Sequence, residues 1–242
     1  DKYFINGDSI NDLKAGKPVF RTGINYQAAE ATYVRASWGQ GYRFPSMAEL
    51  FISTNQSGLE IYPNPDLKPE SGWSSEIGIK QGVKTGKWMG YIDVAAFIQQ
   101  YDDMMEFTFG KFAENQPDPN NPTGSLNFYG LGFKSVNVGT TRITGAELSM
   151  SGQGKINSDL TINILAGYTY MNPVSLDLDQ VYAESIHGYE LTYKNSGSDS
   201  TMLKYRYRHI AKADLEIVYK GISLGGSMRY NSFMKNIDKI FK

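Results

Sequence analysis

The stretch that decides the fold class is residues 205–220, which read YRYRHIAKADLEIVYK. Every second residue from Tyr205 to Tyr219 is apolar or aromatic apart from His209, whereas the residues between them are mostly charged. A period of two is that of a β-strand with two different faces, because successive side chains point to opposite sides of a sheet. In a helix the same charges would surround the whole circumference, so the pattern predicts a strand from Tyr205 to Lys220.

The length of this strand points to a membrane. The part from Tyr207 to Tyr219, at about 3.3 Å per residue and a tilt of about 40°, rises about 30 Å. That rise matches the apolar layer of a bilayer, and tyrosines at both ends of an apolar face are typical of membrane β-barrels. A soluble β-sandwich also alternates, so a soluble carbohydrate-binding module is the alternative for this pattern.

The same alternation recurs along the chain and predicts an all-β protein of about eight antiparallel strands. The other predicted strands are residues 20–26, 32–40, 73–81, 88–98, 135–150, 160–170 and 222–230. Their connections are short at some places, such as 220–221, and long at others, namely 41–71, 110–134 and 172–203. Short turns at one end and long loops at the other are the pattern of outer-membrane barrels, so we expect a segment of an antiparallel transmembrane β-barrel.

Composition narrows the function classes. The 242 residues include no cysteine, which excludes disulfide scaffolds, thiolate catalysis and cysteine-held metals. The 24 Lys and Arg balance 25 Asp and Glu, so no nucleic-acid partner is expected. A mean hydropathy of -0.41 is that of a soluble protein, but averaging two opposite strand faces hides an apolar one. No apolar run approaches the roughly 20 residues of a transmembrane helix.

Several short sequence motifs of this chain are also found in one known family. They are residues 35–46 (RASWGQGYRFPS), 48–51 (AELF), 63–70 (PNPDLKPE), 75–80 (SEIGIK), 93–97 (DVAAF) and 101–104 (YDDM), followed by weaker words at 144–148 (TGAEL) and 207–209 (YRH). In this order and spacing they resemble the TonB-dependent outer-membrane receptors. The resemblance covers most of the chain and implies a barrel of about 22 strands closed by a plug domain.

The resemblance also implies partners and a location. Similar proteins lie in the bacterial outer membrane and import scarce, large ligands, with energy from the TonB system acting through the plug. The expected partners are therefore TonB, outer-membrane lipid and an extracellular ligand, with a surface lipoprotein as a further candidate. We expect a chelate of the iron–siderophore type; a haem or cobalamin receptor and a passive porin-like channel are alternatives. The family's plug and last strands have no counterpart in residues 1–242, so we expect a partial barrel domain.

The long loops hold the residues expected to contact ligand. An anionic iron chelate suits arginine and aromatic side chains, since a guanidinium pairs with carboxylate or catecholate while a ring stacks. The predicted ligand contacts are Tyr42, Arg43, Phe51, Tyr62, Tyr129, Tyr182 and His187. A second set of residues is expected to have a structural role, and it lies in the two motifs that bracket the first long loop. There, prolines fix the points where the chain leaves and re-enters the strands, and Asn or Asp hydrogen-bonds the turn backbone. It comprises Pro45, Asn64, Pro65, Asp66, Leu67, Pro69 and Glu70.

No catalytic site, metal site or cofactor is predicted, and the protein is not expected to be an enzyme. The chain lacks a nucleophile elbow, a phosphate-binding glycine loop and a metal triad. Its two histidines, His187 and His209, have no second histidine at ligand spacing. The charged strand residues are expected to line the lumen and form ion pairs against a plug: Arg35, Glu76, Lys80, Asp93, Glu147, Arg206, Arg208, Lys212, Asp214, Glu216 and Arg229.

Overall fold

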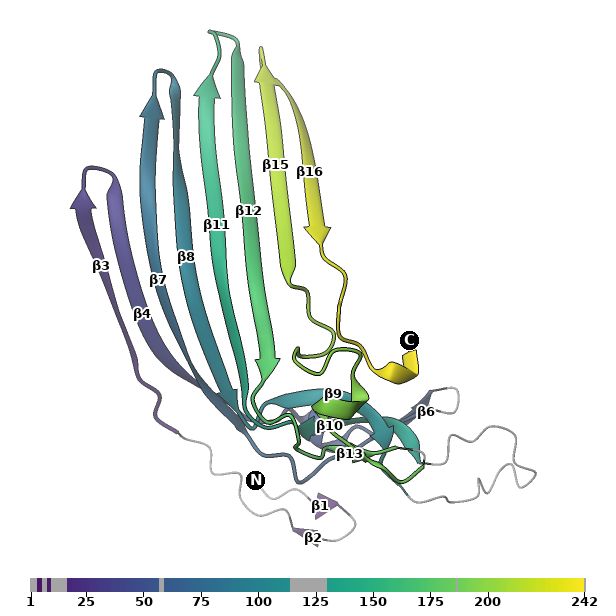
Figure 1. The fold of residues 1–242 in the computed structure, drawn as a ribbon. Helices are drawn as coiled ribbons and strands as arrows, with labels where there is room; N and C mark the ends of the chain where they lie inside the picture. The colour runs from purple at the N-terminus through teal and green to yellow at the C-terminus, as the bar shows by residue number, and fades with distance from the viewer. Residues whose placement is uncertain are drawn as a thin grey trace.

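The computed structural model describes residues 4–5, 8–9, 17–56, 59–113, 130–185 and 187–241 (Figure 1). Its main element is an eight-stranded antiparallel sheet in the order β16-β15-β12-β11-β8-β7-β4-β3. The strands are β3 (Arg21–Ala29), β4 (Thr32–Arg43), β7 (Glu70–Thr85), β8 (Trp88–Asp102), β11 (Thr141–Lys155), β12 (Leu160–Ser175), β15 (His209–Tyr219) and β16 (Ile222–Asn231). This sheet confirms the predicted fold class. Within the described ranges, no helix has the length and apolar character needed to cross a membrane.

The two ends of this sheet differ. At one end, the top in Figure 1, short hairpin turns join β3 to β4, β7 to β8, β11 to β12 and β15 to β16. The last of these turns is Lys220-Gly221, with φ angles of 48° and 82°. A two-residue turn with two positive φ angles matches the twist of its strands, and glycine adopts such an angle at little cost. The long connections leave from the opposite end, as the alternation of loop lengths predicts.

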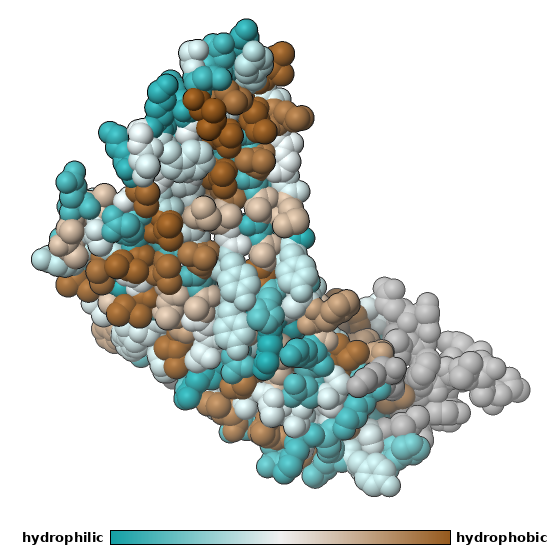
Figure 2. Space-filling view, turned by 45° about the horizontal axis from the view of Figure 1, so that its top comes forward, coloured by the Kyte–Doolittle hydropathy of each residue, from teal (hydrophilic) through white to brown (hydrophobic). Residues whose placement is uncertain are grey.

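The two faces of the sheet also differ. One row of paired residues crosses all the strands and is entirely apolar or aromatic: Tyr26, Val34, Ile79, Val94, Leu148, Tyr168, Ala211 and Tyr230. The next row points the other way and is mostly polar: Asn25, Arg35, Gly78, Ala95, Glu147, Thr169, Ile210 and Asn231. Six of these eight side chains are exposed, Tyr26 at 64%, and Val34 and Ala211 are half-buried, which suits a face that meets lipid. Figure 2 shows hydrophobic side chains gathered over the strands and hydrophilic ones at the hairpin tips.

The polar face carries the ion pairs expected of a lumen wall. Arg35 donates from Nε to Glu76 at 2.8 Å and from Nη1 to Asp93 at 2.8 Å, so one guanidinium joins three strands. Its paired residue is Gly78, where a Cβ would lie 2.7 Å from Arg35 Cζ. The absence of a side chain at Gly78 therefore gives the guanidinium room to lie flat on the sheet and reach both carboxylates.

One predicted strand is in fact two strands. Residues 135–150 divide between β10 (Leu131–Asn137) and the start of β11. The break falls at 138–140, where Gly139 has a φ of 84° and Val138 is 1% exposed. A positive φ ends the extended conformation, and burial of Val138 fixes the turn. The alternation runs through this break because both flanking segments are strands, so the sequence period alone does not locate it.

The strand predicted from Tyr205 to Lys220 begins later, at His209. Tyr205 has a φ of 56°, and its hydroxyl donates to Asp238 at 2.8 Å. Arg206 binds Glu106 of β9 (Met105–Lys111) at 3.1 Å, so the prediction that Arg206 lies in the barrel wall is wrong. The alternating Tyr and Arg residues before His209 belong to the loop region, where tertiary contacts override the strand pattern.

The long loops fold together into a second sheet of six strands, in the order β14-β13-β9-β10-β6-β5. Its strands are β5 (Thr54–Gln56), β6 (Leu59–Tyr62), β9 (Met105–Lys111), β10, β13 (Ala183–Glu184) and β14 (Glu190–Leu191). They come from three different loops, and β10 joins β6 in parallel. The other short elements are α1 (Met47–Phe51), α2 (Tyr193–Ser196), η1 (Lys239–Phe241), β1 (Phe4–Ile5) and β2 (Asp8–Ser9). We call the second sheet, α1, α2, η1 and the described residues that connect them to the barrel strands the loop layer.

The loop layer holds most of the buried core in the described residues. One cluster joins Val136 and Val138 to Tyr182, Tyr193 and Leu203, so residues of the β12–β15 connection pack on β10. A second cluster consists of Leu50, Leu67 and Met105, with Phe51 packed against it. These clusters make the long loops a folded layer at one end of the barrel wall.

Candidate ligand-binding site

The first long loop leaves β4 and returns to β7 through one charged junction. Arg43 ends β4 and Glu70 begins β7, and the two residues are paired in the sheet. Arg43 Nε donates to Glu70 at 2.8 Å, and Nη1 donates to Glu49 of α1 at 3.0 Å. One guanidinium therefore ties both strand ends to the helix between them, using the fork geometry that arginine offers to carboxylates.

Glu49 also closes the N-terminus of α1. Ser46 accepts from the Glu49 N–H at 3.2 Å, while the Glu49 carboxylate accepts from the Ser46 N–H at 2.7 Å. This pair of reciprocal hydrogen bonds is a capping box, and it needs only the serine at position 46 and the glutamate three residues later at position 49. Burial opposes ionisation of Glu49, but the hydrogen bonds from Ser46 and Arg43 outweigh it and hold the pKa of Glu49 below its ordinary value.

The returning segment contributes the other family residues. Asn64 donates its N–H to Leu50 O at 3.0 Å and its side-chain amide to Ser135 O at 2.8 Å. Leu67 is 5% exposed and packs with Leu50, while Glu70 accepts from the Met105 N–H at 3.0 Å. Of the remaining members of this set, Pro45 is buried, Pro69 is half-buried, and Pro65 and Asp66 are exposed. The Asn64 side chain therefore bonds a neighbouring loop, whereas the bonds within its own loop are made by its backbone N–H and C=O.

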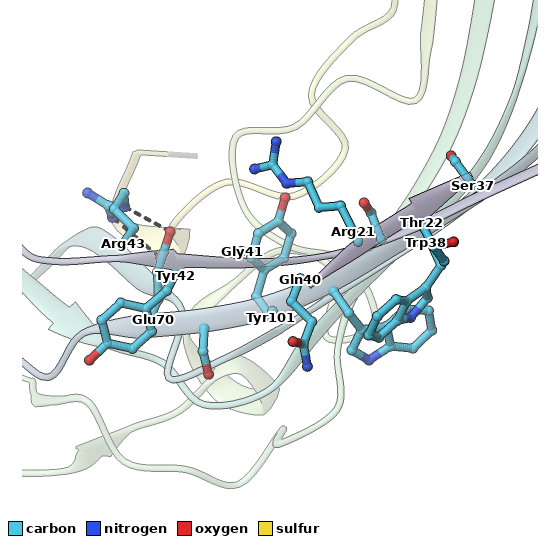
Figure 3. A pocket seen from close by; sticks show the side chains of 15 residues that line it. Arg21, Thr22, Ser37, Trp38, Gln40, Gly41, Tyr42, Arg43, Glu70 and Tyr101 are labelled. Carbon is cyan, nitrogen blue, oxygen red and sulfur yellow. Dashed lines mark hydrogen bonds and ion pairs between the residues drawn. The ribbon is translucent and has the colours of Figure 1, made fainter. Parts of the chain in front are cut away.

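Beside this junction lies a groove of about 500 Å³ at the ends of β3, β4 and β7. Gly39, Gly41 and Gly72 line it without side chains, and a Cβ on Gly72 would lie 3.1 Å from a ring carbon of Tyr101. A Cβ on Gly39 would lie 3.2 Å from Arg21 Cγ. Figure 3 shows Arg21 and Tyr101 on one side of the strands and Gln40 on the other. The glycines thus form a thin floor, with an arginine and a tyrosine over it on the polar face.

The two arginines of the groove differ in whether neighbouring carboxylates balance their charge. Arg43 faces the carboxylates of Glu49 and Glu70, so its charge is already balanced. Arg21, on β3, forms no ion pair within the part of the chain that the structure describes, and its strand is exposed. An anion that enters the groove on the polar face would therefore meet the charge of Arg21 first.

The predicted ligand contacts fall in several places. Tyr42 and Arg43 line the groove, and the Lys17 ammonium lies 4.9 Å from the centre of the Tyr42 ring. Phe51 packs at the second core cluster, and the Tyr62 ring lies 6.0 Å from that of Phe112.

The three remaining contacts lie away from the groove or outside the described residues. His187 is exposed, with its ring 6.4 Å from that of Tyr189. Tyr182 is 8% exposed, and its hydroxyl accepts from Lys204 at 2.6 Å and donates to Ser196 at 2.6 Å. Tyr129 lies outside the described residues. The role of all seven residues in ligand contact stays a prediction, and the position of Tyr182 gives it a structural role in addition.

Sequence reasoning missed a buried polar network around Tyr182. The side chain of Lys204 is 2% exposed and that of Asp238 is 7% exposed, and the two form an ion pair. Asp238 also accepts from the Tyr205 hydroxyl at 2.8 Å. Lys204 precedes the strand pattern and Asp238 lies near the end of the chain, so only tertiary folding brings these opposite charges together.

A second buried pair adjoins the first. Glu106 of β9 accepts from the Tyr193 hydroxyl and from Arg206 Nη2 at 3.1 Å. Burial raises the pKa of Glu106 above its ordinary value, although Tyr193 and Arg206 act in the opposite direction. Burial and the neighbouring Glu106 likewise raise the pKa of Tyr193. These contacts fasten the β12–β15 connection to β9.

The fold, the polar lumen face and the strand-exit junction define a class of protein, the outer-membrane barrel receptors. A family model described as "TonB dependent receptor-like, beta-barrel" matches residues 2–239, and the chain belongs to this family. It is thus a protein of the bacterial outer membrane and not an enzyme. Family membership excludes the soluble carbohydrate-binding module.

Curated relatives place the chain among receptors for different ligands. The chain is 21% identical over 215 residues to the hemoglobin and hemoglobin-haptoglobin-binding protein A of Haemophilus influenzae, covering 75% of this chain and 19% of that protein. It is 34% identical over 105 residues to the vitamin B12 transporter BtuB of Vibrio vulnificus, covering 42% of this chain and 15% of the transporter. It is 24% identical to a hemin receptor of Yersinia pestis, covering 69% and 24%. The chain spans a quarter or less of the length of these relatives.

Solved structures agree on the fold. The hemophore receptor HasR of Serratia marcescens, in complex with its hemophore and heme, matches with a TM-score of 0.56 and 14% identity, over 91% of this chain and 32% of that receptor. The siderophore receptor PirA of Pseudomonas aeruginosa matches with a TM-score of 0.52 and 11% identity, over 91% and 34%. At these identities the similarity shows the fold alone.

Proposed function

We propose that residues 1–242 are part of the barrel domain of a receptor that binds an anionic metal chelate outside the cell and imports it, with a chelate of the iron–siderophore type as the ligand. TonB would drive release through a plug domain that fills the barrel. Outer-membrane lipid covers the apolar face, and a surface lipoprotein is a further candidate partner of the loop layer. No covalent step acts on the ligand.

The observation that carries this proposal is the groove beside the strand-exit junction. It combines a glycine floor, the unpaired charge of Arg21 among the described residues and the ring of Tyr101. A guanidinium pairs with carboxylate or catecholate oxygens, and a tyrosine ring stacks on a flat ligand. The polar wall below, with Arg35 between Glu76 and Asp93, suits a surface that faces a polar plug and the passing ligand.

A haem receptor is the second candidate, because one relative is named a hemoglobin-binding protein and another a hemin receptor. The exposed His187, beside Tyr189, has the chemistry to ligate haem iron. The relative that transports vitamin B12 keeps cobalamin as a third ligand class. Siderophore chelates, haem and cobalamin are chemically different ligands that can be labelled and supplied separately. One set of uptake assays therefore distinguishes the three candidates.

The test is uptake by cells that express the full-length receptor as their single receptor for these ligands, with and without TonB. Labelled ferric siderophores, haem and cobalamin are supplied in turn. We expect TonB-dependent uptake of an anionic ferric chelate, reduced several-fold in Arg21→Gln and unchanged in Lys84→Gln, an exposed lysine near the β7–β8 turn. Uptake that persists without TonB would identify a passive channel. Uptake of haem that is lost in His187→Ala would favour the haem receptor.

A further inference from the structure

One charged residue of the barrel wall lies on the face that meets lipid. Arg142 of β11 is an even number of residues from Leu148 of the apolar row, so its side chain leaves the sheet on the apolar side. The strand registers place every other Lys, Arg, Asp and Glu of the eight wall strands on the lumen face, except Asp102 at the end of β8. Arg142 thus breaks the alternation of its strand, and the proposed function does not account for it.

Arg142 lies at the depth of the lipid head groups on the loop side of the membrane. The ten steps from Trp88 to Ile98 on the apolar side of β8 rise about 25 Å at about 3.3 Å per residue and a tilt of about 40°, which matches the apolar band of outer-membrane barrels. Gln100, the next residue on this side, pairs with Arg142, so Arg142 lies one row beyond the band. Trp73 pairs with Gln100 from β7, and tryptophans gather at head-group depth. The long loops of such barrels lie outside the cell, so these head groups belong to the outer leaflet.

No carboxylate balances the charge of Arg142 within the described ranges. Its Nε and Nη2 donate to the side-chain oxygen of Gln100 at 3.3 and 2.7 Å, and this amide is neutral. The exposed Asp102 lies on the same side, one row further toward the loops, and no ion pair joins it to Arg142. The Gln100 amide therefore holds the guanidinium in place and leaves its positive charge available to an anion.

Small side chains follow Arg142 toward the middle of the membrane. Ala146, two rows nearer the hairpin turns, pairs with Ala96 of β8, and both alanines are exposed. On the next strand, Tyr170 pairs with Ala146 and is 37% exposed. Because an alanine projects less than a tyrosine, the paired alanines form a shallow strip beside an aromatic ring. A lipid acyl chain that lies along this strip brings its head group to Arg142.

We propose that Arg142 binds a phosphate of an anionic outer-leaflet lipid whose acyl chain lies along this strip. The inference goes beyond the proposed function, because it concerns the lipid outside the barrel and not the imported ligand. The chain belongs to a family of outer-membrane proteins, so lipid is the solvent of this face. A guanidinium offers a fork of N–H donors that matches a phosphate. An arginine on the lipid side costs little at the edge of the apolar band, whereas it is strongly destabilising at the midplane.

A guanidinium that reaches only water is the competing explanation. A long side chain near the edge of the apolar band extends its charge into the aqueous layer above the lipid. In that case, removal of the charge at position 142 leaves the preference among lipids unchanged. If Arg142 binds a phosphate, the preference for a phosphorylated lipid depends on this charge.

The experiment measures lipid binding to the purified full-length receptor in a neutral detergent, by native mass spectrometry. The probes are lipid A, a phosphorylated glycolipid, and the same lipid with its phosphates removed. We expect the wild type to prefer lipid A, and Arg142→Gln to lose about fivefold of this preference, the effect of one cation beside an anionic head group. Arg142→Lys keeps most of the preference, because the charge remains. The matched control, Arg229→Gln, removes an exposed arginine from the lumen face of β16 and keeps the wild-type preference.

A second variant neutralises Arg142 without removing it. Gln100→Glu places a carboxylate where the Gln100 oxygen accepts from Nη2 at 2.7 Å, so the preference for lipid A falls as in Arg142→Gln. Migration of the unheated folded barrel on a gel checks each variant for folding, and Gln100→Glu carries the test should Arg142→Gln fail to fold.

Two results would overturn the inference. One is a preference for lipid A that is the same in the wild type, Arg142→Gln and Gln100→Glu. The other is displacement of lipid A from the wild type by inorganic phosphate, which would show a site for free anions and not for a lipid. Neither result affects the proposed import function, because uptake of the ligand is measured separately.

Discussion

Replacement of Lys204 by methionine tests whether the loop layer is held together by buried charge. The Lys204 side chain is 2% exposed, and its ammonium donates to Asp238 and to the Tyr182 hydroxyl. Methionine has a similar length and no charge. The Asp238 carboxylate, 7% exposed, keeps the Tyr205 hydroxyl as a donor at 2.8 Å but loses its cation.

The expected cost follows from this burial. Removing one partner of a buried ion pair costs about 3–5 kcal/mol, because the remaining charge stays buried without compensation. At about 1.4 kcal/mol per factor of ten, local opening of the loop layer becomes about 100-fold to 4,000-fold more frequent. The matched control is Lys194→Met, since Lys194 pairs with Asp179 at 3.1 Å but the two side chains are 65% and 78% exposed. Exposed pairs contribute about 0–1 kcal/mol, so this control stays within a few-fold of wild type.

The assay is hydrogen exchange of the full-length receptor in detergent, read at the Leu203 and Tyr205 amides. These amides donate to Pro173 O at 3.0 Å and to Asn236 O at 2.8 Å, so they exchange when the layer opens. The double variant that adds Asp238→Leu removes the stranded charge and recovers part of the protection. Exchange in Lys204→Met that matches Lys194→Met would refute the reasoning, since the pair would then contribute no more than a surface pair.

Three further predictions address other parts of the molecule. Gly78→Ala displaces the Arg35 guanidinium and lowers the free energy of unfolding by about 1 kcal/mol. The measurement is the temperature at which half of the folded band on a gel is lost, which we expect to fall. Gly226→Ala serves as control, because a Cβ at Gly226 meets nothing within 4 Å. Arg43→Lys keeps the charge but loses the fork, so amides of α1 exchange a few-fold faster, a cost of about 1 kcal/mol. Burial raises the pKa of Glu106 above 4.5, so the stabilising proton is fully bound below pH 4.5 and is lost as pH rises through the folded pKa. Loop-layer protection therefore declines over that rise in wild type, and a Glu106→Gln variant with the same decline would contradict this origin.

The barrel wall could be predicted from the sequence because its determinants are local. A strand with lipid on one face and polar contacts on the other repeats its pattern every two residues, and residues 211–217 keep that pattern without interruption. The capping box of Ser46 and Glu49 is likewise written in four consecutive residues. The Arg43–Glu70 pair is not local, but both residues lie in family motifs that bracket the first long loop.

The loop layer could not be predicted in the same way, because its contacts join distant segments. Lys204 and Asp238 are separated by 34 residues, and Arg206 and Glu106 by 100. Strands as short as β13 have no period to detect. The apparent alternation around Tyr205 misled the prediction, because buried hydrogen bonds and a positive φ decide its conformation. The groove at Arg21 needed the register of β3 and β4, which sets its glycine floor.

The contacts within the loop layer argue against independent loops. The Asn137 side chain donates to Lys68 O at 2.9 Å and to Asp103 O at 2.7 Å, and it accepts from the Lys68 N–H at 2.9 Å. Its own carbonyl accepts from Gln180 at 3.2 Å, so this residue bonds all three long loops. Because displacement of one loop must break bonds to the other two, a ligand bound at the groove beside Arg43 biases the layer as a unit, by the difference in the ligand's affinity for the two arrangements.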